Sequence, residues 1–251
     1  QQLRTMENHF NVLIVDRSQK QFRLTLEGEK IYNDSKEILR LYQQLSDEVS
    51  DLNSVVGGTI KVSSTFSIGL HIIPEYIKKF IKSYPSVNVR LDYSRNANIY
   101  DDVITNNADI GLVAYAQPNK LIEIVDFQEE ALVLICPLEN PLAKRKTVQI
   151  KDLSQQSMVS YEPHMGSHKA IVSLFKKENA KLEVSSQFDN IELIKHAVEV
   201  NMGCAIVPIS AVKRDLDTRD YKIINFKGKP YKRTLSAIFR KGKRQPPSVK
   251  T

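Results

Sequence analysis

The sequence predicts an α/β fold in which a long amphipathic helix precedes a domain of alternating strands and helices. From residue 59 to residue 240, short β-prone runs alternate with helix-like segments. This pattern is typical of βαβ units whose sheets are covered on both faces. Before this region, apolar residues recur at alternating spacings of four and three, as in a coiled-coil helix. The chain has 251 residues, 41% hydrophobic and 26% charged, which is enough for two or three compact units.

The first 25 residues are typical of the end of a winged helix-turn-helix. A helix is expected over residues 2–10, and Asn11 follows it in a position suited to a left-handed cap. Two β-prone runs, residues 12–15 and 21–24, then flank a basic loop. In a winged helix-turn-helix, the recognition helix enters the major groove and nearby basic residues contact phosphates.

One long helix is expected over the next segment, residues 26–57. Thr25 is suited to cap it, and Glu27 and Glu29 in the first turn favour the positive end of the helix dipole. The apolar stripe is narrow, which favours pairing with a second helix. The alternative is a lone helix packed on its own domain. The stripe is Ile31, Ile38, Tyr42, Leu45, Val49 and Leu52, with Ser35 as its polar position.

The alternating region predicts two lobes with a cleft between them, the architecture of periplasmic binding proteins. We expect lobe 1 to comprise residues 58–131 and 236–251, and lobe 2 to comprise residues 132–235. A helix is expected after the first strand up to Ser83, with a restart at Pro74, and further helices over residues 99–106, 167–179 and 191–201. Strands are expected over residues 59–63, 87–93, 109–113, 132–136, 157–161, 182–188, 204–207 and 234–240.

The N-terminal stretch QLRTMENHFNVLIVDRSQKQFRLTLEGE resembles the end of the DNA-binding domain of LysR-type transcriptional regulators. The family pattern there is Q-I-R-x-L-E-x-x-L-G-x-x-L-F-x-R, then R-L-T-x-x-G-E. Asn11 stands where the family usually has Gly, which is a mild departure because Asn tolerates the left-handed conformation. Val15 stands where it usually has Phe. The matching residues are Gln2, Arg4, Glu7, Arg17, Arg23, Leu24, Thr25, Gly28 and Glu29.

The resemblance continues through residues 132–143, 194–208 and 240–243, so it spans essentially the whole chain. It implies that residues 1–25 are the C-terminal part of a DNA-binding domain and that residues 26–57 pair two subunits. The chain opens inside a helix without Met and stops where the family has a further helix. The resemblance therefore implies that residues are missing at both ends.

DNA contacts are assigned by analogy with the family. Gln1 and Arg4 would lie on the groove-facing side of the recognition helix. Arg17, Lys20 and Arg23 lie on or beside the wing, where they would neutralise phosphates. The alternative for Arg17 and Arg23 is a structural salt bridge.

The net charge of the chain does not identify its DNA-binding segment. The chain carries a formal charge of +7, but residues 222–251 hold ten Lys or Arg and no acid. The remaining residues therefore have a small acidic excess. No apolar run is long enough to span a bilayer, and the first residues lack a signal-peptide core. Cys136 and Cys204 lie in apolar runs without metal-ligand spacing, which favours buried free thiols and a cytoplasmic protein.

The sequence carries no recognisable catalytic constellation. It contains no Walker A loop, GxGxxG, HExxH or GxSxG motif. His164 and His168 are four residues apart, but Pro163 and Gly166 favour a loop-to-helix turn over a continuous helix that could bind a metal, which leaves them as loop histidines near a ligand cleft. We therefore expect no enzyme activity, no cofactor and no metal site.

Ligand binding is the better interpretation of the polar residues that follow the expected strands. In α/β lobes, ligands bind outside the carboxyl ends of strands and against helix N-termini. Arg95 could hold a carboxylate or a sulfate-like group, or be a solvated surface residue. Ser64 or Thr65 could instead be helix N-caps. The candidate effector residues are Ser63, Ser64, Thr65, Phe66, Arg95, Asn96, Tyr115, Gln117, Tyr161, Gly166, Ser167, Asp189 and Asn190.

Together these features predict a bacterial transcription regulator of the LysR type. It would bind double-stranded promoter DNA as a dimer or tetramer and respond to a small polar, anionic effector in the cleft, with no membrane partner. The alternative is a solute-binding protein of a transport system with the same two-lobed fold, which would leave the heptad helix unexplained.

Overall fold

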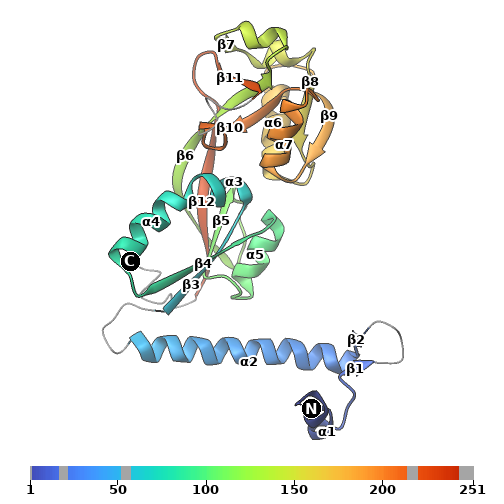
Figure 1. Ribbon diagram of the computed structural model, residues 1–251, viewed down its shortest axis with the longest axis vertical. Helices are drawn as coiled ribbons and strands as arrows, with labels where there is room; N and C mark the ends of the chain where they lie inside the picture. Colours follow the sequence, from blue (N-terminus) through green and yellow to red (C-terminus); the bar gives the residue numbers. More distant parts are fainter. Residues whose placement is uncertain (1, 17–21, 52–57, 214–219, 243–251) are drawn as a thin grey trace. The chain divides into compact units, whose positions relative to one another are not determined.

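The computed structural model describes residues 2–16, 22–51, 58–213 and 220–242 (Figure 1). The chain divides into two units, Gln1–Val56 and Gly57–Thr251, and each is described by itself. No helix in the described ranges is both long enough and apolar enough to cross a membrane.

The first unit contains α1 (Gln2–Phe10), a short antiparallel hairpin of β1 (Val15–Asp16) and β2 (Arg23–Leu24), and α2 (Leu26–Asp51). Asn11 has a φ of 51° after α1, which confirms the left-handed cap. The first hairpin strand starts later than expected. The backbone before it bonds to Glu7 instead: the Val12 amide donates to the Glu7 carbonyl and the Ile14 amide to its carboxylate.

Thr25 caps α2 as the sequence predicts, because its Oγ1 accepts a hydrogen bond from the Gly28 amide at 2.9 Å. Gly28 lies against the hairpin, and a Cβ at this position would overlap the carbonyl oxygen of Ile14. The glycine therefore allows the first turn of α2 to approach the hairpin closely.

The second unit begins with three parallel strands, β3 (Gly58–Ser64), β4 (Val87–Tyr93) and β5 (Ile110–Ala114). The helices α3 (Phe66–His71) and α4 (Ile73–Ser83) follow β3, and α5 (Asn96–Ile104) follows β4. Helix α5 packs Ile99 and Val103 against one face of this sheet. Gly111 permits the close approach, since a Cβ there would press on both side chains.

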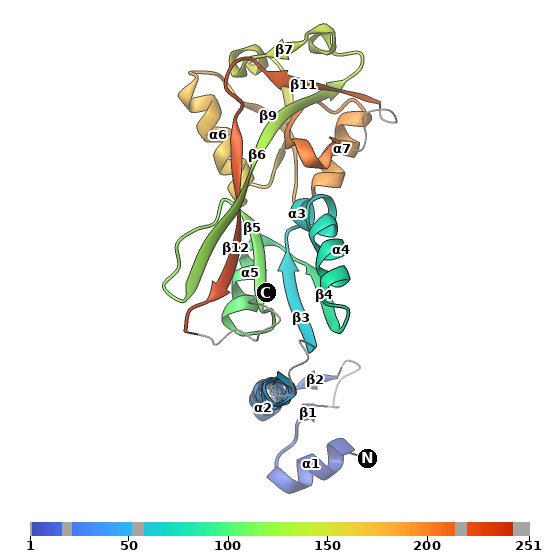
Figure 2. The ribbon, with the colours of Figure 1, turned by 90° about the vertical axis from the view of Figure 1, so that its left-hand side faces the viewer.

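Strand β6 (Ile122–Pro137) runs through both lobes, and β12 (Lys232–Arg240), which the chain enters on its return from lobe 2, pairs antiparallel with the first half of β6 (Figure 2). β12 lies between β5 and β6 in the sheet order β4-β3-β5-β12-β6-β11-β7. From Leu132 onward, β6 pairs instead with β10 (Ala205–Pro208) and β11 (Tyr221–Phe226). The two strands therefore connect the lobes.

Lobe 2 is built around the second half of β6. Its further strands are β7 (Thr147–Val148), which pairs with β11, and the parallel pair β8 (Ser157–Tyr161) and β9 (Glu183–Phe188). Helices α6 (Gly166–Lys177) and α7 (Ile191–Glu199) pack against this core, which includes Phe175, Ile194 and Ile206. The described part of the lobe also contains short 3-10 helices, among them η1 (Pro141–Lys144), η2 (Ile150–Leu153) and η3 (Ile209–Ala211).

The predicted two-lobed α/β fold is confirmed, but β6 is much longer than the strand expected over residues 132–136. Its first half is rich in acidic residues, which are poor strand formers. Partners on β12 accommodate them: Lys232 Nζ lies 2.6 Å from Glu129 Oε2, and Ser236 donates to Asp126 at 2.6 Å. Strands β7 and β11 were not predicted.

Candidate functional site

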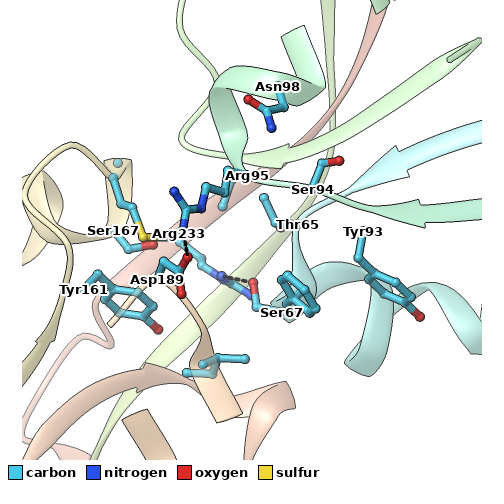
Figure 3. Close-up of a pocket in the computed structure, with 15 residues that line it drawn as sticks. Thr65, Ser67, Tyr93, Ser94, Arg95, Asn98, Tyr161, Ser167, Asp189 and Arg233 are labelled. Atoms are coloured by element: carbon cyan, nitrogen blue, oxygen red, sulfur yellow. Dashed lines mark hydrogen bonds and ion pairs between the residues drawn. The ribbon is translucent and has the colours of Figure 1, made fainter. Parts of the chain in front are cut away.

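A cleft of about 340 Å³ lies between the two lobes (Figure 3). Both lobes contribute side chains to its wall, and most of them sit at strand ends or helix starts. The lining residues are Thr65, Phe66, Ser67, Tyr93, Ser94, Arg95, Asn98, Ala114, Tyr161, Met165, Gly166, Ser167, Asp189, Ile191 and Arg233.

Lobe 1 forms its wall from the carboxyl ends of β3, β4 and β5. Because these strands are parallel, their ends meet at one edge of the sheet. Thr65 and Ser67 follow β3, and Arg95 follows β4. Phe66 stacks on Tyr93 with ring centroids 5.4 Å apart, which gives this wall an aromatic patch.

Lobe 2 forms the opposite wall in the same way, from the parallel strands β8 and β9. Tyr161 ends β8 and Asp189 follows β9. Gly166 and Ser167 begin α6, whose N-cap residue Met165 provides no side-chain cap. The N-cap of α5, Arg95, provides none either, and neither helix has an acidic residue in its first turn. Amide groups at such helix starts can receive an anion.

A buried ion pair supports the cleft beneath these walls. Arg233 donates from Nε to Glu130 Oε2 at 2.8 Å and from Nη1 to Ser67 Oγ at 3.0 Å. Both charged side chains are nearly fully buried, at 2% and 3% exposure. The other carboxylate oxygen of Glu130 accepts a hydrogen bond from the Ser210 amide. The pair is therefore held on both sides, as a buried pair requires.

Two polar atoms at the cleft lack hydrogen-bond partners within the described part of the chain: Thr65 Oγ1 and Arg233 Nη2. Nη2 lies 2.8 Å from Glu130 Oε2, but this contact is an ion pair without hydrogen-bond geometry. Buried polar atoms are nearly always bonded in folded proteins. An unbonded hydroxyl and guanidinium N–H therefore mark a place where a ligand can supply acceptors.

Besides the contacts of Glu130, two further side-chain pairs in the described residues join one lobe to the other. Arg95 Nη2 lies 2.6 Å from Asp189 Oδ2 inside the cleft (Figure 3). His71 Nε2, on α3, lies 2.8 Å from Glu192 Oε1 on α7. Glu192 also pairs with the buried Lys195 at 2.7 Å. Burial would raise the pKa of the Glu192 carboxyl, but hydrogen bonds with His71 and Lys195 outweigh it and lower that pKa to about 2.

Of two predicted tyrosines, Tyr161 is buried and lines the cleft, whereas Tyr115 is half-buried and lies outside its wall. Burial raises the pKa of Tyr161 and Tyr115 above the usual value, although Arg233 acts in the opposite direction. Tyr115 has a φ of 56°, which is unusual for a bulky residue. Gly166 lies against it: a Cβ on Gly166 would sit 3.1 Å from the Tyr115 Cβ. Glycine here lets α6 start close to the end of β5.

The structure brings together seven of the predicted effector residues in the cleft wall: Thr65, Phe66, Arg95, Tyr161, Gly166, Ser167 and Asp189. The others lie outside the wall. Ser63 is buried and donates to Asp102, and Ser64 donates to the Thr65 carbonyl. Gln117 is exposed and donates to the Tyr115 carbonyl, while Asn190 caps α7. Asn96 begins α5, but its side chain lies outside the described set.

Sequence reasoning missed several residues of the wall. Ser67, Ser94 and Asn98 lie within a few positions of predicted residues, so the strand-end rule could have included them. Arg233 lies in a basic stretch of the C-terminal region, and its local sequence carries no signal of a cleft. Only its pairing with Glu130, 103 positions away, reveals its place.

In the first unit, Arg4 on α1 and Arg23 on β2 are exposed. Gln1, Arg17 and Lys20 lie outside the described residues. On α2, the stripe residues Ile38, Tyr42 and Leu45 are 66%, 68% and 58% exposed, whereas Ile31 is half-buried. The side chain of Val49 and the whole of Leu52 lie outside the described set.

Of the two predicted loop histidines, His164 lies in the loop before α6, whereas His168 lies on α6, and both have other contacts. His164 pairs with Glu162 at 3.4 Å, and His168 Nδ1 lies 3.1 Å from Ser160 Oγ. Over the described residues, no three His, Cys, Asp or Glu side chains are grouped to hold a metal ion.

The two α/β lobes, the connecting strands β6 and β12 and the polar cleft define a two-lobed module of the periplasmic-binding-protein type. Residues 53–251 match the family model described as LysR substrate binding domain. The chain therefore belongs to the LysR family of transcriptional regulators.

Known relatives agree with this membership. The chain is 30% identical over 245 residues to a probable RuBisCO transcriptional regulator of Thalassiosira pseudonana, which covers 94% of this chain and 80% of the relative. A crystal structure of full-length CbnR complexed with target DNA has a TM-score of 0.80 at 20% identity, covering 99% of this chain and 85% of that chain. The effector binding domain of QuiR in complex with shikimate has a TM-score of 0.71 at 20% identity, covering 77% and 92%.

Proposed function

We propose that this chain senses a small anionic molecule in the inter-lobe cleft and passes the signal to promoter DNA as a dimer or tetramer. The observation that carries the proposal is the cleft itself. Arg95 and Arg233 face it, Asp189 is the one acid among its described lining residues, and two helix starts without side-chain caps open onto it. This combination favours an oxyanion such as a carboxylate, sulfate or phosphate.

We assign each proposed function to one segment, in the order of the chain. Residues 1–25 contact DNA, with Arg4 at the groove and Arg23 beside the wing; residues 26–57 pair subunits. Lobe 1 (residues 58–131 and 236–251) and lobe 2 (residues 132–235) bind the effector. The protein would work in the cytoplasm and catalyse no reaction. The QuiR complex with shikimate supports a small organic ligand for this module.

A thermal-shift screen of the chain tests the effector proposal. Small carboxylates, sulfate and phosphate are compared with neutral amides and alcohols of similar size. A ligand at about 100 times its Kd stabilises the folded state by about 2.7 kcal/mol, so we expect anions, and not their neutral counterparts, to raise Tm. Arg95→Gln should abolish the shift. The control Arg90→Gln should retain it, because Arg90 pairs with Asp92 on the exposed part of β4.

A shift that survives Arg95→Gln, or one produced by neutral compounds alone, would contradict the proposal. The second arm adds an anion that passes the screen to the native protein on its promoter DNA. Because a ligand changes an assembly only if it binds one arrangement better, the footprint or the bend of the DNA should change. An unchanged footprint at saturating ligand would mean that the chain binds the anion but that this binding does not change its contact with DNA.

A further inference from the structure

The anion-binding guanidinium of lobe 1 is already paired with a carboxylate of lobe 2. Arg95 Nη2 and Asp189 Oδ2 are 2.6 Å apart, and Figure 3 shows the two side chains meeting across the cleft. Asp189 comes from the loop between β9 and α7, so the contact joins opposite walls. A carboxylate from the protein thus holds the place that the proposed effector would take.

We propose that Asp189 is a built-in competitor that sets which anions the cleft accepts. This inference rests on the proposed function, because it concerns the same site. A bound oxyanion would bring a second negative charge beside Asp189, so it must displace the Asp189 carboxylate from Arg95. Ligands with one weak acceptor would fail, whereas those with several strong acceptor oxygens would succeed.

The exposure of the pair makes such displacement feasible. The Arg95 side chain is 62% exposed and that of Asp189 is 28% exposed. Water and salt weaken ion pairs in such positions. The Arg233–Glu130 pair is buried and braced by Ser67 and Ser210. Arg95 is therefore the exchangeable cation of the cleft, and Arg233 is the fixed donor.

The cleft also offers an incoming anion more donors than Asp189 uses. The helix starts at Asn96 and Gly166 have no side-chain cap, and the Thr65 hydroxyl has no hydrogen-bond partner among the described residues. An anion with several oxygens can reach these groups as well as Arg95. These extra contacts would offset the loss of the Arg95–Asp189 pair.

The test is calorimetric titration of the whole chain with inorganic sulfate at constant ionic strength. Asp189→Asn keeps the shape of the side chain and removes its charge, so Arg95 loses its ion-pair partner. We expect the sulfate concentration at half-saturation to fall at least about fivefold. Asp189→Ser serves as a second variant and should act in the same direction. Arg95→Gln should abolish binding.

His71→Ala is the matched control. It breaks a different polar contact between the lobes, His71–Glu192, and leaves Arg95 paired with Asp189. If Asp189 competes for Arg95, this variant should bind sulfate within about twofold of the wild-type. Equal tightening in His71→Ala and Asp189→Asn would instead mean that loosened lobes explain the gain, which overturns the inference.

Unchanged or weaker sulfate binding in Asp189→Asn and Asp189→Ser would also overturn the inference that Asp189 competes for Arg95. The absence of sulfate binding in the wild-type and in both variants would overturn it as well. The proposed function fails separately. If organic anions still raise Tm through Arg95 while the Asp189 variants change nothing, only the competitor role is lost. If no anion of any kind binds, the anionic effector is lost as well.

Discussion

Individual residues at the cleft differ in how firmly the fold holds them. Arg233 is fixed by a buried carboxylate and a serine hydroxyl, whereas Arg95 is paired near the surface with a residue of the other lobe. The local sequence of Arg95, directly after a strand, predicts its position. That of Arg233 does not, because a basic residue in a strand is usually exposed.

Glu192 offers a test of stability at this scale. Its carboxylate neutralises Lys195, which is 1% exposed and also donates to the Ala211 carbonyl. Glu192→Gln should lower the free energy of unfolding by about 1–2 kcal/mol, after allowance for the partial exposure of Glu192. Its pKa lies at about 2, below the ordinary 4.5. The contribution is therefore full above pH 4.5 and is lost as the pH falls towards 2.

Urea unfolding of wild-type and variant across this pH range measures the effect. The difference between the two proteins should shrink with falling pH. Glu183→Gln is the control, since Glu183 pairs with Lys181 on the surface, and it should remain close to wild-type throughout. A difference that stays constant down to pH 2 would mean that the charge of Glu192 does not stabilise the fold.

At the scale of elements, α2 presents apolar side chains that its own unit leaves uncovered. Ile38, Tyr42 and Leu45 of the stripe are exposed, as are the neighbouring Leu39 and Leu41. Exposed apolar residues at heptad spacing are typical of the seam of a coiled coil. The structure of one chain therefore supports the proposal that this helix pairs with a second copy.

Ile38→Lys tests this pairing. Burial of an isoleucine contributes about 1.5–3 kcal/mol, and a lysine in the seam forfeits it in both helices. The dimer dissociation constant should rise by at least about tenfold, as measured by analytical ultracentrifugation. Asn33→Lys adds the same side chain at an exposed position outside the stripe and should leave the constant unchanged. Equal dissociation in both variants would rule out the stripe as the seam.

At the scale of the whole molecule, the proposed operator binding would need two copies of the first unit, because symmetric half-sites lie about one helical turn apart. Arg4 and Arg23 are exposed there, one on the helix and one on the hairpin. Groove contacts carry specificity and phosphate contacts do not. The two residues should therefore have different effects on DNA affinity.

Arg4→Ala in the native protein should weaken binding to the cognate site by about 1–3 kcal/mol and leave non-specific binding nearly unchanged. Arg23→Ala should weaken both alike and reduce the dependence of affinity on salt. Titrations on cognate and scrambled DNA at several salt concentrations distinguish these outcomes. If the Arg4 variant binds the cognate site with wild-type affinity, Arg4 does not contribute to DNA recognition.

The amino-acid sequence by itself determined the order of the parts and the fold class. These features are local patterns, which can be recognised without tertiary contacts. They are the helix end with its left-handed Asn11, the cap at Thr25, the heptad stripe and the alternation of strands and helices. The strand-end rule also placed Thr65, Tyr161 and Ser167 at the cleft wall.

Only the tertiary structure decided how the cleft is closed and supported. The acidic half of β6 is a strand because β12 supplies partners about a hundred positions away, as in the Arg233–Glu130 pair. The contact between Arg95 and Asp189 likewise joins opposite lobes. Such pairings depend on which distant segments of the chain meet in the fold. The local periodicity of the sequence does not determine these meeting points.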